Sequence, residues 1–327
     1  MTILVVTVFI ALVPMMVYTA IIWWLDHWER EPLPLVIGCF FWGAVPSIIL
    51  ALVWSLVFAT AATGVFYGET DLDLVSSTVI APLTEETAKG LGLLVVFLAF
   101  RREIDSLLDG IVYGAVIGFG FAAVENVFYF ISVASEGPVA LSVLFFLRAG
   151  LFGLNHALFA GLTGLGFALA RFRKTSAPRV FLSAAGLFLA MVCHGVHNFF
   201  VSTGLGGVVV SFFVDWTGIL WLFVVIIWSL NRQGHVIRHY LAEEVSRGLV
   251  SAYQARRAGS FSHRLSCGFA LFGHGITSRE NIRRLDQLCA ELAFKKHQLA
   301  MMGDEYGNTR AVKDLRRNLA QLSVKLA

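Results

Sequence analysis

Two adjacent carboxylates and a lysine interrupt an otherwise apolar stretch of the chain. Glu85, Glu86 and Lys89 lie within residues 75–100, a run long enough to be a membrane helix. Ionisable groups at the centre of such a helix cost about 2.5–3.5 kcal/mol each, so they usually face a bundle interior or a water-filled cavity and indicate function. Glu85 and Lys89 have the i, i+4 spacing of a structural ion pair. Glu86 points about 100° away from Glu85 and therefore needs a partner from another helix.

Polar residues interrupt three further apolar stretches. Each taken alone is more typical of a hydrogen bond between helices than of a catalyst. Counted along the predicted helices, however, the carboxylates and imidazoles of four spans fall at one depth, in the outer-to-middle third of the membrane. We therefore predict that they form one site: Glu85, Glu86, Glu125, His156 and His194.

Carboxylates and histidines together are suited to two kinds of chemistry. A glutamate beside imidazoles can activate water as a general base. Alternatively, Glu86, Glu125, His156 and His194 could bind Zn²⁺ through nitrogen and oxygen atoms, with water at the open position. Asn198 shares a helix face with His194 and could donate a hydrogen bond to an oxyanion. The HExxH motif of zincins and the GxSxG motif of serine hydrolases are absent.

Composition places these residues in a polytopic membrane protein. The 327 residues are 57% hydrophobic and only 14% charged, whereas soluble domains carry about 25% charged residues. The four cysteines have no paired spacing and predict neither a disulfide framework nor a cysteine-ligated zinc site. We expect an all-α bundle of about seven membrane spans, with a four-helix catalytic core in spans three to six. The predicted spans are 2–25, 34–60, 75–100, 105–133, 139–170, 180–203 and 207–230.

The charges of the connecting segments alternate along the chain. Segments 26–34, 101–105 and 171–179 contain Lys or Arg, and the intervening segments contain none. The positive-inside rule then predicts an outer N-terminus and a cytoplasmic C-terminus.

The chain changes character after Asn231. Residues 232–327 hold 16 of the 25 Lys and Arg. Leucines at helical spacing within 280–299 and 312–322 predict two amphipathic helices, which could pair against each other. We therefore divide the chain into a membrane domain, 1–231 with a core at about 75–203, and a basic helical cytoplasmic tail, 232–327. The tail is interpreted as a helical appendage or, alternatively, as a basic surface that lies on anionic lipid.

The polar motifs resemble those of the PrsW family of intramembrane proteases, over residues 81–200. PrsW proteins are related to the CAAX prenyl proteases and bacteriocin-immunity proteins, whose EExxxR motif is shortened here to EExxK. The motifs that carry the resemblance are Glu85-Glu86-x-x-Lys89, Asp109-Gly-Ile-Val-Tyr-Gly, Gly-Phe-Ala-Ala-Val-Glu125-Asn126, Arg148 followed by Asn155-His156, and His194-Gly-Val-His-Asn198.

The resemblance implies an activity and roles for these residues. It implies that Glu85, Glu86 and His156 are catalytic and that His194 and Asn198 complete the water and oxyanion site. The family is commonly classed as metalloprotease, which suggests zinc, whereas the CAAX relatives are argued to be glutamate-dependent; both mechanisms stay open here. The family prototype is a site-1 protease that acts on a membrane-bound anti-sigma factor.

These observations together predict an intramembrane endopeptidase in a bacterial cell membrane. Its expected partners are a membrane-anchored protein substrate and the lipid bilayer, and no nucleic acid. Two other functions fit buried Glu and His residues: a proton- or ion-coupled transporter and a non-catalytic membrane module. Carriers usually show internal repeats, and none is visible in the sequence.

Overall fold

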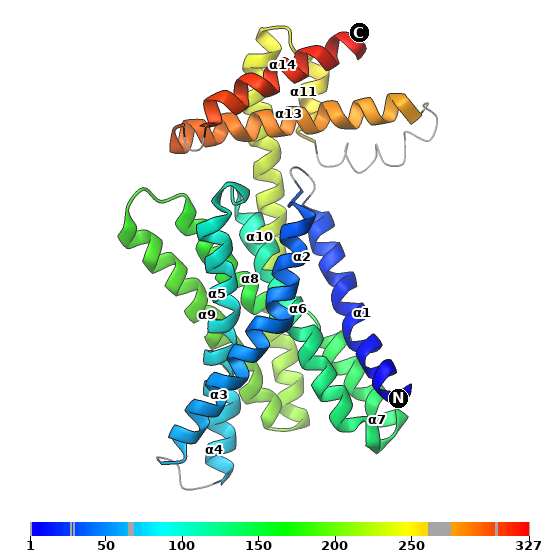
Figure 1. The fold of residues 1–327 in the computed structure, drawn as a ribbon, viewed down its shortest axis with the longest axis vertical. Coiled ribbons are helices and arrows are strands. Elements are labelled where there is room, and N and C mark those ends of the chain that lie inside the picture. The colour runs from blue at the N-terminus through cyan, green and yellow to red at the C-terminus, as the bar shows by residue number, and fades with distance from the viewer. Residues whose placement is uncertain are drawn as a thin grey trace. The chain divides into compact units, whose positions relative to one another are not determined.

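Helices make up the regular structure of the described part of the chain. The computed structural model describes residues 2–26, 28, 30–64, 69–260, 276–304 and 307–326. The α-helices (Figure 1) are α1 (Thr2–Leu25), α2 (Leu33–Trp42), α3 (Ile48–Ala62), α4 (Glu69–Val75), α5 (Ala81–Ala99), α6 (Leu107–Val133), α7 (Pro138–Phe145), α8 (Asn155–Arg171), α9 (Ser176–Ser202), α10 (Leu205–Ser246), α11 (Ala252–Ala258), α13 (Ile276–Met302) and α14 (Asn308–Leu326). Three π-helical segments are η1 (Gly43–Ser47), η2 (Ser76–Ile80) and η5 (Phe146–Leu151), and two 3₁₀ turns are η3 (Arg101–Glu103) and η4 (Ala134–Glu136).

The prediction of an all-α polytopic bundle is confirmed. Within the described residues, six helical segments are long and apolar enough to cross a membrane. The remaining predicted span, 75–100, is also helical, as η2 and α5, but carries the three charges of Glu85, Glu86 and Lys89. The helix of the last predicted span, 207–230, does not end with its apolar run, because α10 continues to Ser246. The end of an apolar run marks where a helix becomes polar, not where its hydrogen bonding stops.

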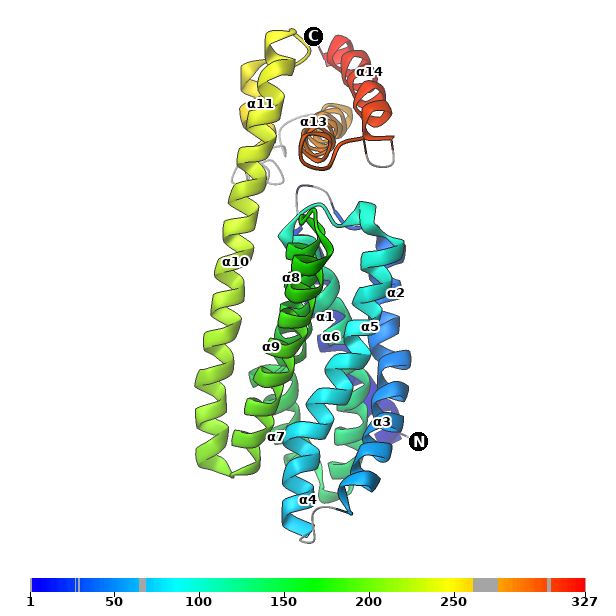
Figure 2. The same ribbon diagram turned by 90° about the vertical axis from the view of Figure 1, so that its left-hand side faces the viewer.

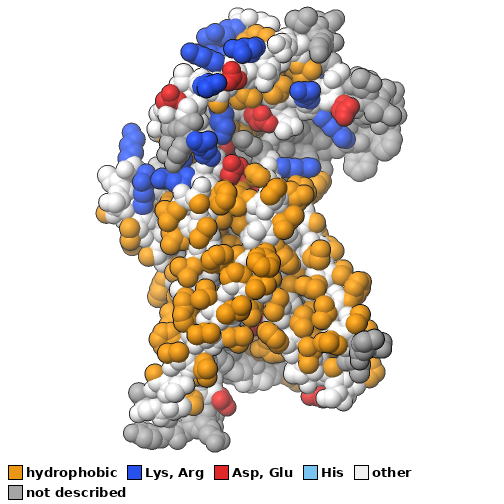
Figure 3. Space-filling view, in the orientation of Figure 1, with side chains coloured by type: hydrophobic (Ala, Val, Ile, Leu, Met, Phe, Trp, Pro, Cys, Tyr) orange, Lys and Arg blue, Asp and Glu red, His pale blue; other side chains and the backbone are white. Residues whose placement is uncertain are grey.

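The chain forms two compact units. The membrane unit comprises residues 1–25 and 31–225, and the tail unit comprises residues 26–30 and 226–327. Hydrophobic side chains cover the visible face of the membrane unit, whereas Lys and Arg gather over the helices of the tail unit (Figure 3).

Helix α6 is the centre of the membrane unit. In its apolar window 89% of the residues are buried, against 17–33% for the other candidate spans. It packs most extensively on α8, which in turn packs on α9, and α5 contacts both α8 and α9. Figure 2 shows α5, α8 and α9 as neighbours in the bundle. These are the four helices that the sequence predicts as the catalytic core.

Glycines let α6 and α8 approach closely. Gly110, Gly114 and Gly118 repeat at four-residue intervals on α6, the small-residue spacing that brings membrane helices together. A Cβ at Gly110 would lie 2.3 Å from the carbonyl oxygen of Gly164, and one at Gly118 would lie 2.3 Å from that of His156. The backbone of His156 is therefore fixed against α6 by the absence of a side chain at Gly118.

Replacement of Gly118 by alanine is expected to destabilise the protein and to displace His156. Overpacking of a rigid contact typically costs about 1–3 kcal/mol. Thermal unfolding of the purified protein should show a lower midpoint for Gly118→Ala, and cleavage activity should fall with it. Gly38→Ala is the matched control, since a Cβ at Gly38 meets no atom within 4 Å. Equal unfolding midpoints for the two variants would contradict the close packing.

The start of α6 is a capping box. The Ser106 side chain accepts hydrogen bonds from the backbone N–H groups of Leu108 and Asp109, and the Asp109 carboxylate accepts from the backbone N–H of Ser106. This arrangement satisfies orphan donors of the first helical turn. The interpretation of Asp109 as a helix-start residue is confirmed.

The tail unit is held together by leucine packing and by ion pairs of buried carboxylates such as Glu244 and Asp286. Leu285 and Leu292 of α13 and Leu319 of α14 are buried, and α14 runs back along α13 (Figure 1). Glu244, fully buried, accepts hydrogen bonds from Lys296 Nζ at 2.8 Å and Arg316 at 2.6 Å. The two predicted amphipathic helices are thus present, with their apolar stripes used for packing within the unit.

Candidate active site

Lys89 lies at the centre of the polar groups in the membrane unit. Its side chain is fully buried, and its ammonium Nζ donates a hydrogen bond to Glu86 Oε1 at 2.6 Å. Nζ also lies 3.0 Å from His156 Nδ1 and 3.7 Å from Glu85 Oε2. The ring of Phe121 lies 4.2 Å from Nζ, a distance at which an aromatic face attracts a cation. One ammonium therefore contacts carboxylates of its own helix and an imidazole of α8.

The structure refines the predicted pairing on α5. The i, i+4 pair of Glu85 and Lys89 is present at 3.7 Å, but the shorter contact of Lys89 is with Glu86 at 2.6 Å. The expectation that Glu86 needs a partner from another helix is confirmed, because His194 Nδ1 of α9 lies 2.8 Å from Glu86 Oε1. Glu86 is completely buried, whereas the Glu85 side chain is 14% exposed. The two neighbouring carboxylates thus differ in both contacts and access.

His194 is held in a defined orientation. Its ring stacks on Phe159 with a centroid distance of 4.8 Å and an interplanar angle of 14°. When Nδ1–H donates to the Glu86 carboxylate, the unprotonated Nε2 faces Glu85 Oε2, which lies 4.0 Å away. His194 therefore presents a lone pair toward the more accessible carboxylate.

His156 is positioned by the break that precedes α8. The π-helical segment η5 ends at Leu151, three residues intervene, and His156 is the second residue of α8. Its Nε2 lies 2.9 Å from Glu125 Oε2, and its Nδ1 faces Lys89. With Nε2–H donating to Glu125, the Nδ1 lone pair points into the cluster, as it does for a metal-binding histidine oriented by a carboxylate.

Glu125 is engaged by two basic groups. It forms a salt bridge with Arg148, whose Nε donates to Asn126 Oδ1 at 2.7 Å and whose guanidinium lies 3.7 Å from the centroid of Tyr129. Its Oε2 also lies 2.9 Å from His156 Nε2. One group of acids and histidines in the membrane unit has donor atoms within 4.8 Å of one another: Glu85, Glu86, His156 and His194. Three of the four predicted metal ligands are in this group, and Glu125 lies beside it.

The donor atoms of Glu85, Glu86, His156 and His194 are of the types that bind a metal ion. Two imidazole nitrogens and carboxylate oxygens are the ligand types that catalytic zinc takes, with three protein ligands and a water. Glu85 Oε2 and Glu86 Oε2 are buried and accept no hydrogen bond from any residue that the structure describes. Uncompensated carboxylate oxygens of this kind are costly in an apolar interior and suit a cation or a water molecule. The ammonium of Lys89 already supplies one positive charge to the same group.

Asn198 lies outside this group of four. Its side-chain Nδ2 donates a hydrogen bond to the carbonyl oxygen of Ser77 at 2.8 Å, within the π-helical segment that precedes α5. An amide nitrogen carries two hydrogens, and among the described residues the second has no recorded partner.

A second buried polar cluster joins α8, α9 and α10 and was missed in the sequence. Asp215 Oδ2 accepts hydrogen bonds from Asn155 Nδ2 and Ser211 Oγ, both at 2.9 Å, and lies 2.7 Å from His197 Nδ1. Ser211 Oγ lies near the same nitrogen of His197, at 2.8 Å, so the three do not form a Ser-His-Asp relay, which uses both ring nitrogens. The cluster could have been predicted from Asp215, an acidic residue inside the apolar span 207–230.

Comparisons with known proteins decide the family. A family model described as "PrsW family intramembrane metalloprotease" matches residues 31–230. The chain belongs to the PrsW family. "Protease PrsW" of Clostridioides difficile (strain 630) is 28% identical over 206 residues, which cover 63% of this chain and 80% of the relative.

Two further PrsW relatives agree with this assignment. "Protease PrsW" of Geobacillus kaustophilus (strain HTA426) is 31% identical over 173 residues, covering 53% of this chain and 69% of the relative. The Bacillus subtilis (strain 168) protein of the same name is 29% identical over 178 residues, covering 54% and 74%. No solved structure matches the chain significantly.

The PrsW assignment confirms the prediction of an integral, multi-pass intramembrane protease. It favours peptide hydrolysis over the transporter and the non-catalytic module. All of the clustered residues lie within the matched range 31–230, which ends close to the start of the tail unit.

Proposed function

We propose that this PrsW protein hydrolyses a peptide bond of a membrane-anchored protein with a water molecule activated by the cluster of α5, α8 and α9. The observation that carries the proposal is the convergence of Glu85, Glu86, His156 and His194, from three helices, within 4.8 Å. Burying two carboxylates and two imidazoles together is expensive inside a membrane bundle. We assign catalysis to residues 1–231, with the core at about 75–203.

Glu85 is the proposed general base. A base needs a free lone pair and access to the water that it deprotonates. Among the described residues Glu85 Oε2 accepts no hydrogen bond; this oxygen is itself buried, but the side chain as a whole is 14% exposed. Glu86 Oε1, in contrast, is shared by Lys89 and His194, and the residue is completely buried. Glu86 is therefore proposed to fix the positions of Lys89 and His194.

The histidines and Asn198 are proposed to contact the water and the scissile peptide. The inward lone pairs of His156 Nδ1 and His194 Nε2 can orient a water molecule beside Glu85. The second amide hydrogen of Asn198 is the proposed donor to the oxyanion that develops on the peptide carbonyl, a role that typically contributes about 10²–10³-fold in rate. The Lys89 ammonium stabilises the negative charge of the same region.

Zinc is the proposed metal of the cluster. His156, His194 and Glu85 would hold it, with Glu86 and Glu125 as the carboxylates that orient the two histidines. Glu85 would then act as a ligand and not as the general base, so the zinc-dependent and the glutamate-dependent mechanisms are alternatives. A bound zinc ion supplies Lewis acidity and lowers the pKa of its water to about 7. The carboxylate–histidine pairs on both imidazoles support this assignment, which requires the Lys89 ammonium to move away from His156 Nδ1.

The proposed substrate is a single-span membrane protein cleaved near its extracytoplasmic face, such as an anti-sigma factor. The support is the predicted depth of the site and the loop charges. The most direct test uses proteoliposomes that contain the purified protein and a membrane-anchored reporter. The wild-type protein should cleave the reporter, and the double variant Glu85→Ala/Glu86→Ala should not. Equal cleavage by the double variant would remove these residues from the site.

The orientation of the chain across the membrane can be tested separately. Basic loops alternate with loops that lack Lys and Arg, so the N-terminus should lie outside and the C-terminus in the cytoplasm. A reporter that is active only in the cytoplasm should be active when fused after Ala327 and inactive within residues 202–207. The reverse pattern would place the catalytic cluster nearer the cytoplasmic surface.

A further inference from the structure

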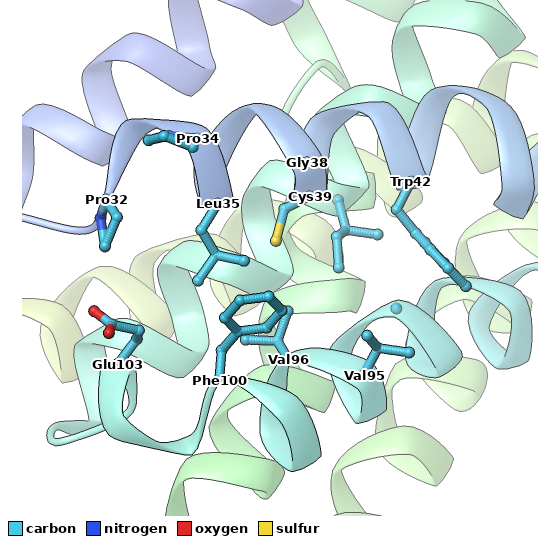
Figure 4. A pocket seen from close by; sticks show the side chains of 12 residues that line it. Pro32, Pro34, Leu35, Gly38, Cys39, Trp42, Val95, Val96, Phe100 and Glu103 are labelled. Atoms are coloured by element: carbon cyan, nitrogen blue, oxygen red, sulfur yellow. The ribbon is translucent and has the colours of Figure 1, made fainter.

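A cavity of about 480 Å³ lies between α2 and the C-terminal half of α5, apart from the catalytic cluster (Figure 4). This volume is within the range of about 300–1,000 Å³ that small-molecule sites occupy. Apart from one carboxylate, its wall is formed by apolar and glycine residues: Pro32, Pro34, Leu35, Gly38, Cys39, Trp42, Gly92, Val95, Val96, Phe100 and Ile117.

The two ends of the cavity differ chemically. Glu103 lies at one end and Trp42 at the other (Figure 4). Helix α2 begins at Leu33 and α5 ends at Ala99, so the Glu103 end lies where both helices reach the membrane boundary. The Trp42 end lies further along both helices, inside the hydrocarbon region. The cavity therefore runs from a polar boundary into an apolar interior. A phospholipid has the same order, with its headgroup at the boundary and its acyl chains in the interior.

The carboxylate of Glu103 is the charged group that lines the cavity; Arg101 and Arg102 of the same turn, η3, do not line it. A carboxylate at the mouth of an apolar cavity favours a cation there and disfavours an anion. An acyl chain gains no preference from entering the cavity, because the bilayer buries its CH₂ groups equally well. Selectivity must therefore come from the headgroup beside Glu103.

We propose that this cavity binds one phosphatidylethanolamine molecule, with an acyl chain between α2 and α5 and its ammonium group at Glu103. The primary ammonium can donate hydrogen bonds to the carboxylate, a charge-assisted contact. Phosphatidylglycerol lacks the ammonium and carries a net negative charge, which Glu103 repels. Phosphatidylcholine has a cation without N–H donors, so it should bind less tightly than phosphatidylethanolamine.

A second cavity serves as a comparison within the same protein. It has a volume of about 450 Å³, lies on another side of α2 and is lined by apolar residues and Thr19. The Thr19 hydroxyl already donates to the carbonyl oxygen of Met15. This cavity has no charged group, so any lipid chain in it should show no preference for headgroup.

The bound lipid would stabilise the contact between Trp42 of α2 and the catalytic helix α5. Trp42 Nε1 donates a hydrogen bond to the carbonyl oxygen of Ala88 at 3.1 Å. The indole reaches α5 because Gly92 has no side chain; a Cβ there would lie 2.4 Å from Trp42. An acyl chain packed against Trp42 therefore stabilises the contact of α2 with the residue before Lys89.

Native mass spectrometry of the full-length protein in detergent tests the proposal. The protein is mixed with equal amounts of phosphatidylethanolamine, phosphatidylglycerol and phosphatidylcholine, and the retained lipids are counted. The wild-type protein should retain phosphatidylethanolamine about three- to tenfold better than phosphatidylglycerol. Equal retention of the two lipids would overturn the proposal.

Two variants separate the headgroup contact from the cavity. Glu103→Gln keeps the shape of the mouth and should reduce the preference to about equal retention. Gly38→Phe fills the cavity from its wall and should lose the selectively bound lipid, whereas Gly38→Ala should keep it, because that position has open space. An unchanged preference in Glu103→Gln, or in folded Gly38→Phe, would overturn the proposal. Neither residue belongs to the catalytic cluster, so the outcome is independent of the protease mechanism.

Discussion

Replacement of Glu85 by glutamine is expected to lower the rate of peptide cleavage by about 10²–10⁴-fold, the range for acid–base groups. The amide has nearly the shape of the carboxylate but cannot accept the proton of water. Glu85 makes two long contacts, with Lys89 at 3.7 Å and with His194 Nε2 at 4.0 Å, and its Oε2 has no hydrogen bond among the described residues. The variant should therefore unfold at nearly the wild-type temperature, which separates loss of catalysis from loss of structure.

The adjacent Glu86→Gln variant should behave differently. Glu86 is the closest counter-charge of the buried Lys89 ammonium. Removal of one partner of a buried ion pair typically costs about 3–5 kcal/mol, so this variant should lose stability together with activity. Glu136→Gln, an exposed carboxylate of η4, is the control and should change neither. Turnover near the wild-type rate in folded Glu85→Gln would remove Glu85 as the base and leave Glu86 to be tested.

Removal of metal is expected to lower the rate of peptide cleavage about as strongly as the Glu85→Gln substitution. The detergent-purified protein should contain about one zinc ion per chain, held by nitrogen and oxygen ligands. A chelator should abolish cleavage, and added zinc should restore it. The fit of His156, His194 and Glu85 to a site with three protein ligands is the physical reason.

Two histidines of α9 provide a matched pair for the metal prediction. His194→Ala removes a proposed ligand and should lower the zinc content as well as the activity. His197→Ala, one helical turn away, changes a histidine that contacts Asp215 and Ser211 instead, so zinc should remain bound. Full activity of metal-free protein would decide for water activation by Glu85 alone. Equal loss of zinc in both variants would contradict the ligand assignment.

The sequence was sufficient to predict the helices and the residues that meet. Apolar runs of membrane length predict spans without knowledge of their partners, and depth along each span brought Glu86 and His194 to one level. Those two residues are in contact at 2.8 Å. The depth of a residue along its span, however, does not tell which face of the helix the residue lies on. The same argument placed Glu125 among the metal ligands, although Arg148 engages it in the structure.

The parts that the sequence did not predict depend on tertiary packing. The π-helical segments η2 and η5 precede α5 and α8, and such segments change which side of a helix a residue faces. The position of Lys89 among two carboxylates of its own helix and His156 requires α5 and α8 to be packed together. The break at residues 152–154, just before α8, consists of Phe, Gly and Leu inside a predicted membrane span, so no change in hydropathy marks it.

The buried ammonium of Lys89 has a consequence for how the protein is made. During insertion into the bilayer, neighbouring carboxylates must be neutralised before the bundle can close around them. Here the neutralising charge is part of the same helix, three and four residues from Glu86 and Glu85. The bundle therefore carries its own counter-ion through biogenesis, and assembly in the membrane does not have to wait for a metal to be delivered.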